Sequence, residues 1–260
     1  MFQSILRPIH SPVLRSVWDV SVGGGSAPWT PAALFAASEQ GCWYDPSDMS
    51  TLFQDSAGTT PVTAAGQPVG RMLDKSGNGN HVTQATAASR PLLAESGGLR
   101  WLAFDGVNDF LQSATGGGFG AQEVAIGYMP TGGAGVSRDV LSDRPNDFRI
   151  AASGGNAHAC VFANVAIAGT ATVGTAIVGG GRVTALSGTV TASRNGVDGT
   201  TAAASATAPA VGYGIARAEG GAAGHFPGNI YGLVWTNRVW TTQERSDTNS
   251  YLASKSGVTL

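Results

Sequence analysis

The apolar residues of this chain alternate with small or polar residues over short stretches, which is the pattern of half-buried β-strands. Residues 99–111 predict two strands hinged at Asp105-Gly106, and residues 225–240 predict a strand that leads into a helix. Further strands are predicted at 122–129, 137–142, 147–152, 158–163, 171–177, 182–187, 190–194 and 210–216. Many short strands separated by Gly, Asn or Pro are typical of a β-sandwich.

Two local signals define turns and ends in the second half of the chain. Asn195-Gly196 predicts a hairpin, because a type I′ turn needs positive φ at both central residues. Thr241 predicts the N-cap of a helix that runs to Lys255, and Glu244 completes a capping box with it.

The first half begins with one predicted short helix over 31–41. Thr30 is its expected N-cap, Pro31 suits the first helical position, and Gly41 suits the stop. A first strand is expected at 42–45.

Residues 1–30 lack the periodicity of a helix or a strand, and a Gly-rich stretch at 23–28 predicts a hinge. Large apolar side chains stand there among prolines and arginines: Ile5, Leu6, Ile9, Val13, Leu14, Val17 and Trp18. A solvated tail would hold fewer of them, so we expect an arm that docks on another protein or on a second copy of this chain. A disordered terminus is the alternative. The expected division is an arm over 1–30 and one sandwich domain over 31–260.

Composition supports this fold class and excludes some partners. Charged residues make up 12% of the 260 residues, Gly contributes 38, and the formal net charge is -2. Because Lys and Arg are not clustered, nucleic-acid binding is not expected. Neither a transmembrane run nor the continuous apolar stretch of a signal peptide is found. We expect Cys42 and Cys160 to be buried thiols, with a disulfide as the alternative.

Two motifs resemble a known family of sandwiches. The chain has F-D-G-V-N-D-F-L at 104–111 and F-P-G-N-I-Y-G-L-V-W-T-N-R at 226–238. In this order and separation they resemble the opening and closing strands of the concanavalin A-like, laminin G-type jelly roll. The resemblance covers residues 41–255 and implies an all-β jelly-roll sandwich with short N- and C-terminal helices. This fold binds surfaces and sugars far more often than it catalyses reactions.

A second resemblance is more specific. The chain has G-C-W-Y-D-P-S-D-M-S-T-L-F-Q-D-S-A-G-T-T-P at 41–61, G-Q-P-V-G at 66–70 and L-D-K-S-G-N-G-N-H at 73–81. These segments resemble virion proteins of tailed bacteriophages and prophages that carry this domain. The resemblance implies a structural virion protein, assembled in the bacterial host cytoplasm, and leaves its position in the particle open.

Acidic and amide side chains gather in the predicted loops. Asp74, Asn78 and Asn80 provide oxygen atoms of the kind that calcium prefers, and many laminin G and lectin domains hold calcium at a loop edge. We expect these residues to stabilise turns through bonds to the backbone, with a calcium site as the alternative.

No catalytic pattern is found. Glycosidases need two carboxyls about 5–9 Å apart, whereas the glutamates are isolated from one another along the chain: Glu39, Glu95, Glu123, Glu219 and Glu244. The four histidines also lie in separate segments. Glycine runs at 23–25, 116–118 and 179–181 match no phosphate-binding motif and are interpreted as turns.

A sugar site in this fold would be built from loops at the rim of a sheet. The residues in and near the polar stretch 142–147 are the candidates for carbohydrate or surface binding: Arg138, Asp143, Arg144, Asn146 and Asp147. The alternative is a solvated hairpin tip. Trp43, Trp101 and Trp235 are expected in the core.

These observations predict a non-enzymatic structural protein of a tailed-phage virion, located at the tail tip, baseplate or fibre. The arm would bind other virion proteins, and the sandwich would contact a host-surface glycan or a neighbouring subunit. A capsid decoration protein and a polysaccharide-degrading enzyme on the same fold are the alternatives. We expect a homo-oligomer with no nucleic-acid partner, no membrane insertion and no cofactor beyond the calcium alternative.

Overall fold

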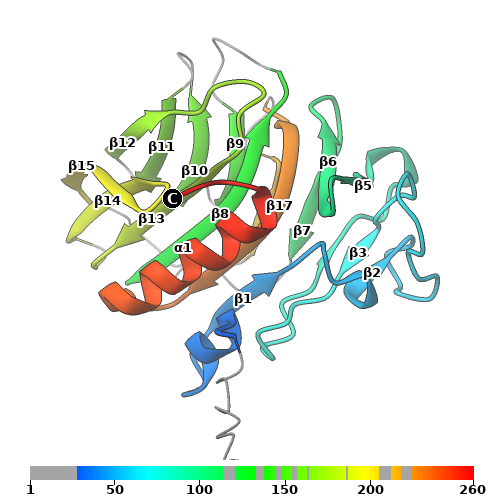
Figure 1. Ribbon diagram of the computed structural model, residues 1–260, viewed down its shortest axis with the longest axis horizontal. Coiled ribbons are helices and arrows are strands. Elements are labelled where there is room, and N and C mark those ends of the chain that lie inside the picture. The colour runs from blue at the N-terminus through cyan, green and yellow to red at the C-terminus, as the bar shows by residue number, and fades with distance from the viewer. Residues whose placement is uncertain are drawn as a thin grey trace, which may run out of the picture.

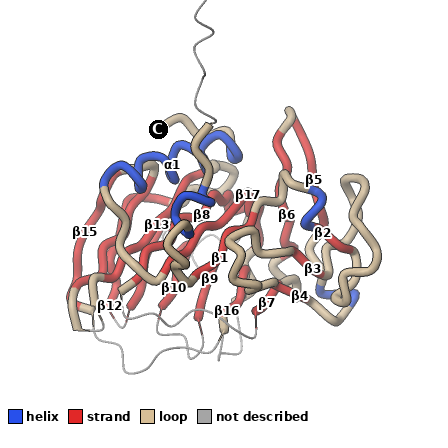
Figure 2. Tube along the Cα trace, turned by 90° about the horizontal axis from the view of Figure 1, so that it is seen from below, coloured by secondary structure: helices blue, strands red, loops and turns tan. Residues whose placement is uncertain are grey.

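The computed structural model describes residues 28–113, 121–132, 138–143, 148–153, 157–162, 164–185, 187–204, 212–217 and 224–260. Their strands form two antiparallel sheets, with a C-terminal helix lying across the outer face of one sheet (Figure 1). Seen from below, the helix and the two sheets are stacked as successive layers (Figure 2). The fold is the all-β sandwich that the sequence predicts.

The sheet that carries the helix is called sheet A here. Its strands follow the order β15 (Val197–Ala203), β14 (Thr189–Arg194), β13 (Ile177–Val183), β8 (Gln122–Pro130), β17 (Pro227–Thr236), β6 (Leu99–Asp105) and β5 (Leu92–Ser96). Strand β17 pairs with β8 on one side; on the other it pairs first with β6 and then with β1 (Gly41–Tyr44). The two motifs at 104–111 and 226–238 therefore meet as neighbouring strands, with Phe104 opposite Gly228.

The opposite sheet is called sheet B. Its strands follow the order β12 (Asn164–Thr170), β11 (Ala157–Phe162), β10 (Phe148–Ser153), β9 (Arg138–Asp143), β16 (Tyr213–Ile215), β7 (Leu111–Ser113), β4 (Val82–Thr83), β3 (Arg71–Met72) and β2 (Leu52–Phe53). All its described neighbouring strands pair antiparallel. Successive side chains along each strand point to opposite faces of the sheet, and one of these faces is turned toward sheet A.

The main core lies between the sheets and is dominated by aromatic side chains. The Trp235 indole stacks on Phe148, with 5.4 Å between ring centroids, and meets the edge of Tyr213 at 5.2 Å. Its ring N–H donates to Gln122 Oε1 over 2.9 Å, so the one polar atom of this buried indole is satisfied. Trp43 is also buried, as predicted, whereas Trp101 is only half-buried and packs on Tyr231.

A second apolar cluster lies on the outer face of sheet A. It is formed by α1 (Thr242–Ser256), the 3₁₀ helix η1 (Pro31–Phe35) and residues of the sheet that alternate with the main core. Leu252 of the helix and Leu34 of η1 cover Trp43 and Val234 there. The predicted capping box is confirmed: the Glu244 N–H donates to Thr241 Oγ1, and the Thr241 N–H donates to Glu244 Oε2. Two further 3₁₀ helices are η2 (Met49–Thr51) and η3 (Ala87–Ser89).

The helix predicted over 31–41 is shorter than expected. It ends at Phe35, and the Thr30 side chain makes no capping hydrogen bond. Gly41 does not stop a helix; it begins β1 with φ of 148°. A Cβ atom there would lie 1.9 Å from the carbonyl oxygen of Trp235, so glycine permits the close approach of β1 to β17.

The strand predictions around residues 164–203 need correction. The segment 171–177 is mostly a connection between β12 and β13, and the strand predicted at 182–187 is the end of β13. The glycine run 179–181 is not a turn, because it lies in the middle of β13. A side chain at Gly181 would collide with Cys160, since its Cβ would lie 2.2 Å from the sulfur. The runs 23–25 and 116–118 lie outside the described residues.

Other expectations are settled by the described residues. Cys42 and Cys160 are both buried free thiols, as predicted, and burial raises the pKa of each. Asn195-Gly196 forms the predicted hairpin between β14 and β15, with φ of 48° and 80°. No described helix is both long and apolar enough to cross a membrane. The docking-arm residues from Ile5 to Trp18 lie outside the described residues.

Candidate functional site

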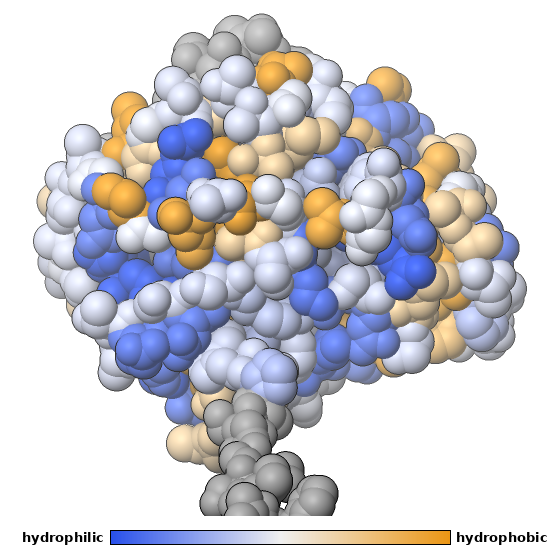
Figure 3. Space-filling model, viewed as in Figure 1, coloured by the Kyte–Doolittle hydropathy of each residue, from blue (hydrophilic) through white to orange (hydrophobic). Residues whose placement is uncertain are grey.

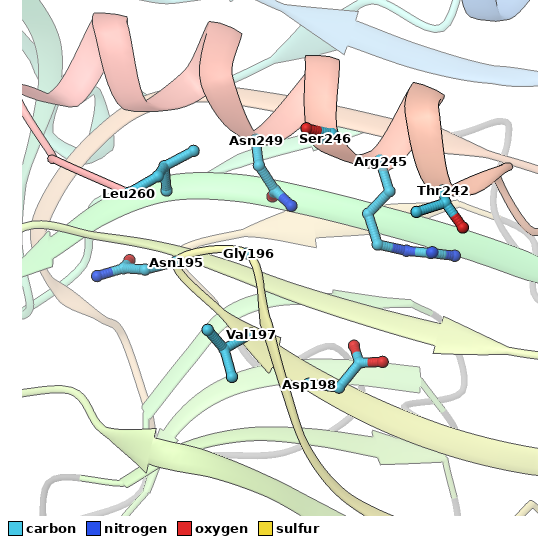
Figure 4. Close-up of a pocket in the computed structure, with 9 residues that line it drawn as sticks. All are labelled: Asn195, Gly196, Val197, Asp198, Thr242, Arg245, Ser246, Asn249 and Leu260. Carbon is cyan, nitrogen blue, oxygen red and sulfur yellow. The ribbon is translucent and has the colours of Figure 1, made fainter.

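A polar cleft of about 550 Å³ separates the β14–β15 hairpin from helix α1 (Figure 4). One wall is the hairpin and the other is a single face of the helix, because positions spaced by three, four and seven residues share a face. The lining residues are Asn195, Gly196, Val197, Asp198, Thr242, Arg245, Ser246, Asn249 and Leu260. Figure 3 shows hydrophilic and hydrophobic residues side by side over this part of the surface.

The hairpin wall is held by bonds from its turn to β13. The Asn195 N–H donates to the Val178 carbonyl over 2.8 Å, and the Val178 N–H donates to Asn195 Oδ1 over 2.9 Å. Asn and Gly suit this turn because both tolerate positive φ. The turn is thus fixed at its base while Asn195 and Gly196 line the cleft.

The helix wall is held by a buried ion pair. Arg245 donates through Nη2 to Glu123 Oε2 over 2.9 Å, and a second bond runs from its Nε to Glu123 Oε1. Glu123 is buried on β8 and also accepts from the Trp240 N–H over 2.8 Å. This pairing fixes the first half of α1 over the sheet.

A second ion pair continues the same row of charges. Arg182, opposite Glu123 in the register of β13 and β8, donates to both Asp198 oxygens over 2.7 and 2.6 Å. Its hydrogen bonds lower the pKa of Asp198, and the same bonds raise the pKa of Arg182. Positive and negative groups alternate from Arg245 to Asp198, so these four charges cancel.

Asn249 is the most enclosed polar side chain of the cleft. The residue is 4% exposed, and its carboxamide makes no hydrogen bond with any other described residue. Figure 4 shows the side chain extending from α1 toward the hairpin. A Cβ atom added to Gly196 would lie 3.9 Å from Asn249 Nδ2, which places the amide across from the turn.

The predicted rim residues do not gather in this cleft. Arg138 and Asp143 are the first and last residues of β9, and five residue steps along a strand span roughly 16 Å. Asp143 is buried, and its Oδ1 accepts from the Phe148 N–H over 2.9 Å, which ties β9 to β10. Arg144, Asn146 and Asp147 lie outside the described residues, so the rim site stays a prediction.

The three residues of the calcium alternative form one hydrogen-bonded loop. Asp74 accepts from the Ser76 N–H and hydroxyl over 2.9 and 2.7 Å and from the Asn80 N–H over 3.0 Å. Asn78 and Asn80 turn their amide nitrogens, which are donors, toward the Gly41 carbonyl. These contacts favour the turn interpretation, because the trio does not present a converging set of free oxygen ligands. No group of three or more His, Cys, Asp or Glu in the described ranges is placed to hold a metal.

Hydrogen bonds also join the loop over 73–81 to strand β1. The Trp43 N–H donates to Asp74 Oδ1 over 2.9 Å, and the Lys75 N–H donates to the Trp43 carbonyl over 2.8 Å. Asn80 Nδ2 donates to the Gly41 carbonyl over 2.8 Å. The loop over 73–81 therefore fastens β1 to the body, which gives these motif residues a structural role.

Neighbouring carboxyls occur in the loop between β6 and β7. Burial raises the pKa of Asp109; burial also opposes the charged form of Asp105, but three backbone N–H groups outweigh it and lower that pKa. Both side chains bond within the loop: Asp105 accepts from Val107, Asn108 and Asp109, and Asp109 accepts from Asp105. These bonds indicate that both carboxylates stabilise the loop, since each is already bound to backbone donors.

The sequence contained only part of the signal for the cleft. The hairpin turn and the helix cap were predictable, but Glu123 and Arg245 are 122 positions apart and β15 is exposed and rich in small residues. Nothing in the local pattern indicates that this hairpin lies opposite α1. A polar face at 242, 245, 246 and 249 was the one signal that could have been used.

No family model and no curated protein matches this chain. Among solved structures, it is similar to a Trypanosoma rangeli sialidase in complex with sialic acid, with 13% identity, a TM-score of 0.58 and coverage of 91% of this chain and 35% of that one. The receptor binding domain of botulinum neurotoxin type G has 10% identity and a TM-score of 0.53, over 70% of this chain and 49% of that one.

The binding domain of Paraclostridial Mosquitocidal Protein 1 is also similar, with 12% identity, a TM-score of 0.55 and coverage of 72% of this chain and 51% of that one. This chain thus spans about a third of the sialidase and about half of each toxin domain. At these identities the likeness shows a shared β-sandwich fold.

Proposed function

We propose that this chain is a non-enzymatic recognition module that binds a glycan on a surface. The observation that carries the proposal is the pre-formed polar cleft, in which ion pairs fix both walls and the amide of Asn249 makes no hydrogen bond with the other residues that the structure describes. Such a cleft suits a polar ligand, because binding sites combine a rigid hollow with a few placed polar groups. The fold it shares with two toxin binding domains supports the same class of role.

The carboxyls described above support a binding role over hydrolysis. Glu123 and Asp198 are bound to arginines, and Asp105 and Asp109 are bound to backbone N–H groups. A glycosidase needs one carboxyl free to donate a proton and a second poised as base or nucleophile. The described carboxyls of the cleft are free for neither role. We therefore favour binding over hydrolysis as the function of the cleft.

The proposed setting is a tailed-phage virion. It rests on the motif segments 41–61, 66–70 and 73–81; the loop over 73–81, hydrogen-bonded to β1, would belong to the shared framework of such domains. The arm over 1–30 would attach the protein to other virion proteins at the tail tip, baseplate or fibre, leaving the sandwich to contact the host surface. A capsid decoration protein is the second candidate, because the same arm and sandwich would serve there equally well.

Two experiments test these proposals separately. The purified chain is applied to a glycan array and incubated with the bound glycans: retention without cleavage supports recognition, cleavage supports the enzyme alternative, and no retention contradicts the proposal. Antibody labelling of virions in the electron microscope tests the setting. Label at the distal tail supports host contact, label over the capsid supports decoration, and no label on particles contradicts a virion role.

A further inference from the structure

We propose that the cleft between the β14–β15 hairpin and α1 binds an uncharged sugar residue, with Asn249 as the group that recognises its hydroxyls. This inference rests on the proposed glycan-binding function and names the site and the chemical class of ligand. It differs from the rim site expected from the sequence, which involves β9 and the residues that follow it.

The enclosed amide of Asn249 is the first observation. A carboxamide offers two donors and one acceptor with two lone pairs. Asn249 places this group on the wall of the cleft in a residue that is 4% exposed, and neither its amide nitrogen nor its oxygen is a fully buried, unpaired atom, so both stay open to a ligand. Neighbouring hydroxyls of a sugar ring present alternating donors and acceptors, which a carboxamide can bind in pairs.

The charge balance of the cleft is the second observation. Arg245 is bound to Glu123 and Arg182 is bound to Asp198, so neither guanidinium is free to pair with an anionic ligand. A carboxylated sugar would have to compete with Asp198 or Glu123 for these arginines. An uncharged ligand avoids that cost and can still donate a hydroxyl hydrogen to the remaining lone pairs of Asp198.

The size and lining of the cleft are the third observation. A volume of about 550 Å³ lies within the range of small-ligand sites, which suits a mono- or disaccharide unit. Val197, a residue that is 70% exposed, lies beside Asn195 and Asp198 on the hairpin wall. An exposed apolar group among polar ones suits a sugar ring, which has an apolar face of C–H groups and a polar edge.

The test measures binding by isothermal titration calorimetry. The probes are neutral mono- and disaccharides (glucose, galactose, mannose, N-acetylglucosamine, lactose) and the corresponding uronic acids. Wild type is compared with Asn249→Ala and with the control Ser250→Ala, which changes an exposed position on the same helix outside the cleft. We expect a neutral sugar to bind wild type and Ser250→Ala equally, and Asn249→Ala to weaken binding by about ten-fold or more.

Thermal unfolding of the same variants separates a binding role from a structural one. Because the Asn249 amide makes no hydrogen bond within the described part of the chain, Asn249→Ala should keep the melting temperature of wild type while losing affinity. A sugar that binds wild type and Asn249→Ala equally, or a preference for uronic acids, overturns the inference and leaves glycan recognition standing. Failure of wild type to bind any carbohydrate overturns both.

Discussion

The Tyr128 hydroxyl lies 2.9 Å from Nδ1 of His158, in the interior between the two sheets. The other ring nitrogen of His158 lies 3.2 Å from the Gly180 carbonyl oxygen. A neutral imidazole satisfies both contacts, since Nε2–H can donate to the carbonyl while Nδ1 accepts from the tyrosine. Burial lowers the pKa of His158 to about 4, so the folded protein keeps this ring neutral at moderately acidic pH.

The first prediction concerns stability against pH. The unfolded chain takes up a proton at His158 near pH 6.5, whereas the folded protein does so only near pH 4, so stability falls as the pH falls through this window. Between pH 6.5 and pH 5 the loss should be about 1.5 kcal/mol. Urea unfolding of wild type and His158→Gln checks it: the two curves of stability against pH should converge on acidification. Parallel curves would show that protonation of His158 does not cause the loss of stability at acidic pH.

The second prediction concerns the glycines inside β13. Gly181→Ala should destabilise the protein by about 1–3 kcal/mol, because its Cβ would lie 2.2 Å from the sulfur of Cys160. The matched control is Gly127→Ala on the adjacent strand β8, where the nearest atoms would lie at 3.5 Å. Urea denaturation midpoints give the comparison. Equal stability of the two variants would contradict the packing described between β13 and β11.

The third prediction concerns the ion pair that holds α1. Arg245→Met leaves the buried Glu123 carboxylate without its partner and should cost about 3–5 kcal/mol in unfolding free energy. Adding Glu123→Gln removes the stranded charge and should restore part of the loss. Arg100→Ala, which breaks the more exposed pair with Glu95, should cost about 1 kcal/mol or less. An Arg245→Met loss as small as that of Arg100→Ala would contradict the buried pairing.

The fourth prediction concerns the start of α1. Thr241→Ala removes the acceptor for the Glu244 N–H and should cost about 1 kcal/mol. Thr242→Ala is the control, because the neighbouring hydroxyl takes no part in the capping box and its loss should stay within about 0.5 kcal/mol. Thermal unfolding checks both. A larger effect at 242 than at 241 would contradict the capping geometry.

Local chemistry explains which elements were predictable. The capping box of Thr241 and Glu244 and the Asn195-Gly196 turn are set by residues close in sequence, and both form as predicted. The motifs at 104–111 and 226–238 lie on neighbouring strands, a pairing across more than a hundred residues that no local signal predicted. Elements whose geometry is set by a few neighbouring residues, such as the helix cap and the hairpin turn, could therefore be predicted from the sequence.

The missed features depend on residues distant in the chain. Gly179–181 looked like a turn, yet the run is a strand because Cys160 and His158 of the opposite sheet occupy the space of side chains at Gly181 and Gly179. Strand β15 lacks apolar alternation because most of its residues are exposed at the edge of sheet A. The cleft forms only when the glycine run is part of β13 and β15 pairs at the sheet edge. No local sequence pattern therefore predicted the cleft.

The most direct test of the proposed recognition site is an NMR titration of the isotope-labelled full chain with a neutral oligosaccharide that the glycan array selects. We expect backbone amide shifts that saturate together at the β14–β15 turn and on the facing side of α1, with Gly196, Ser246 and Asn249 among the most affected. Saturating shifts confined to β9 and β10, or no shifts with any retained glycan, would contradict binding in the cleft.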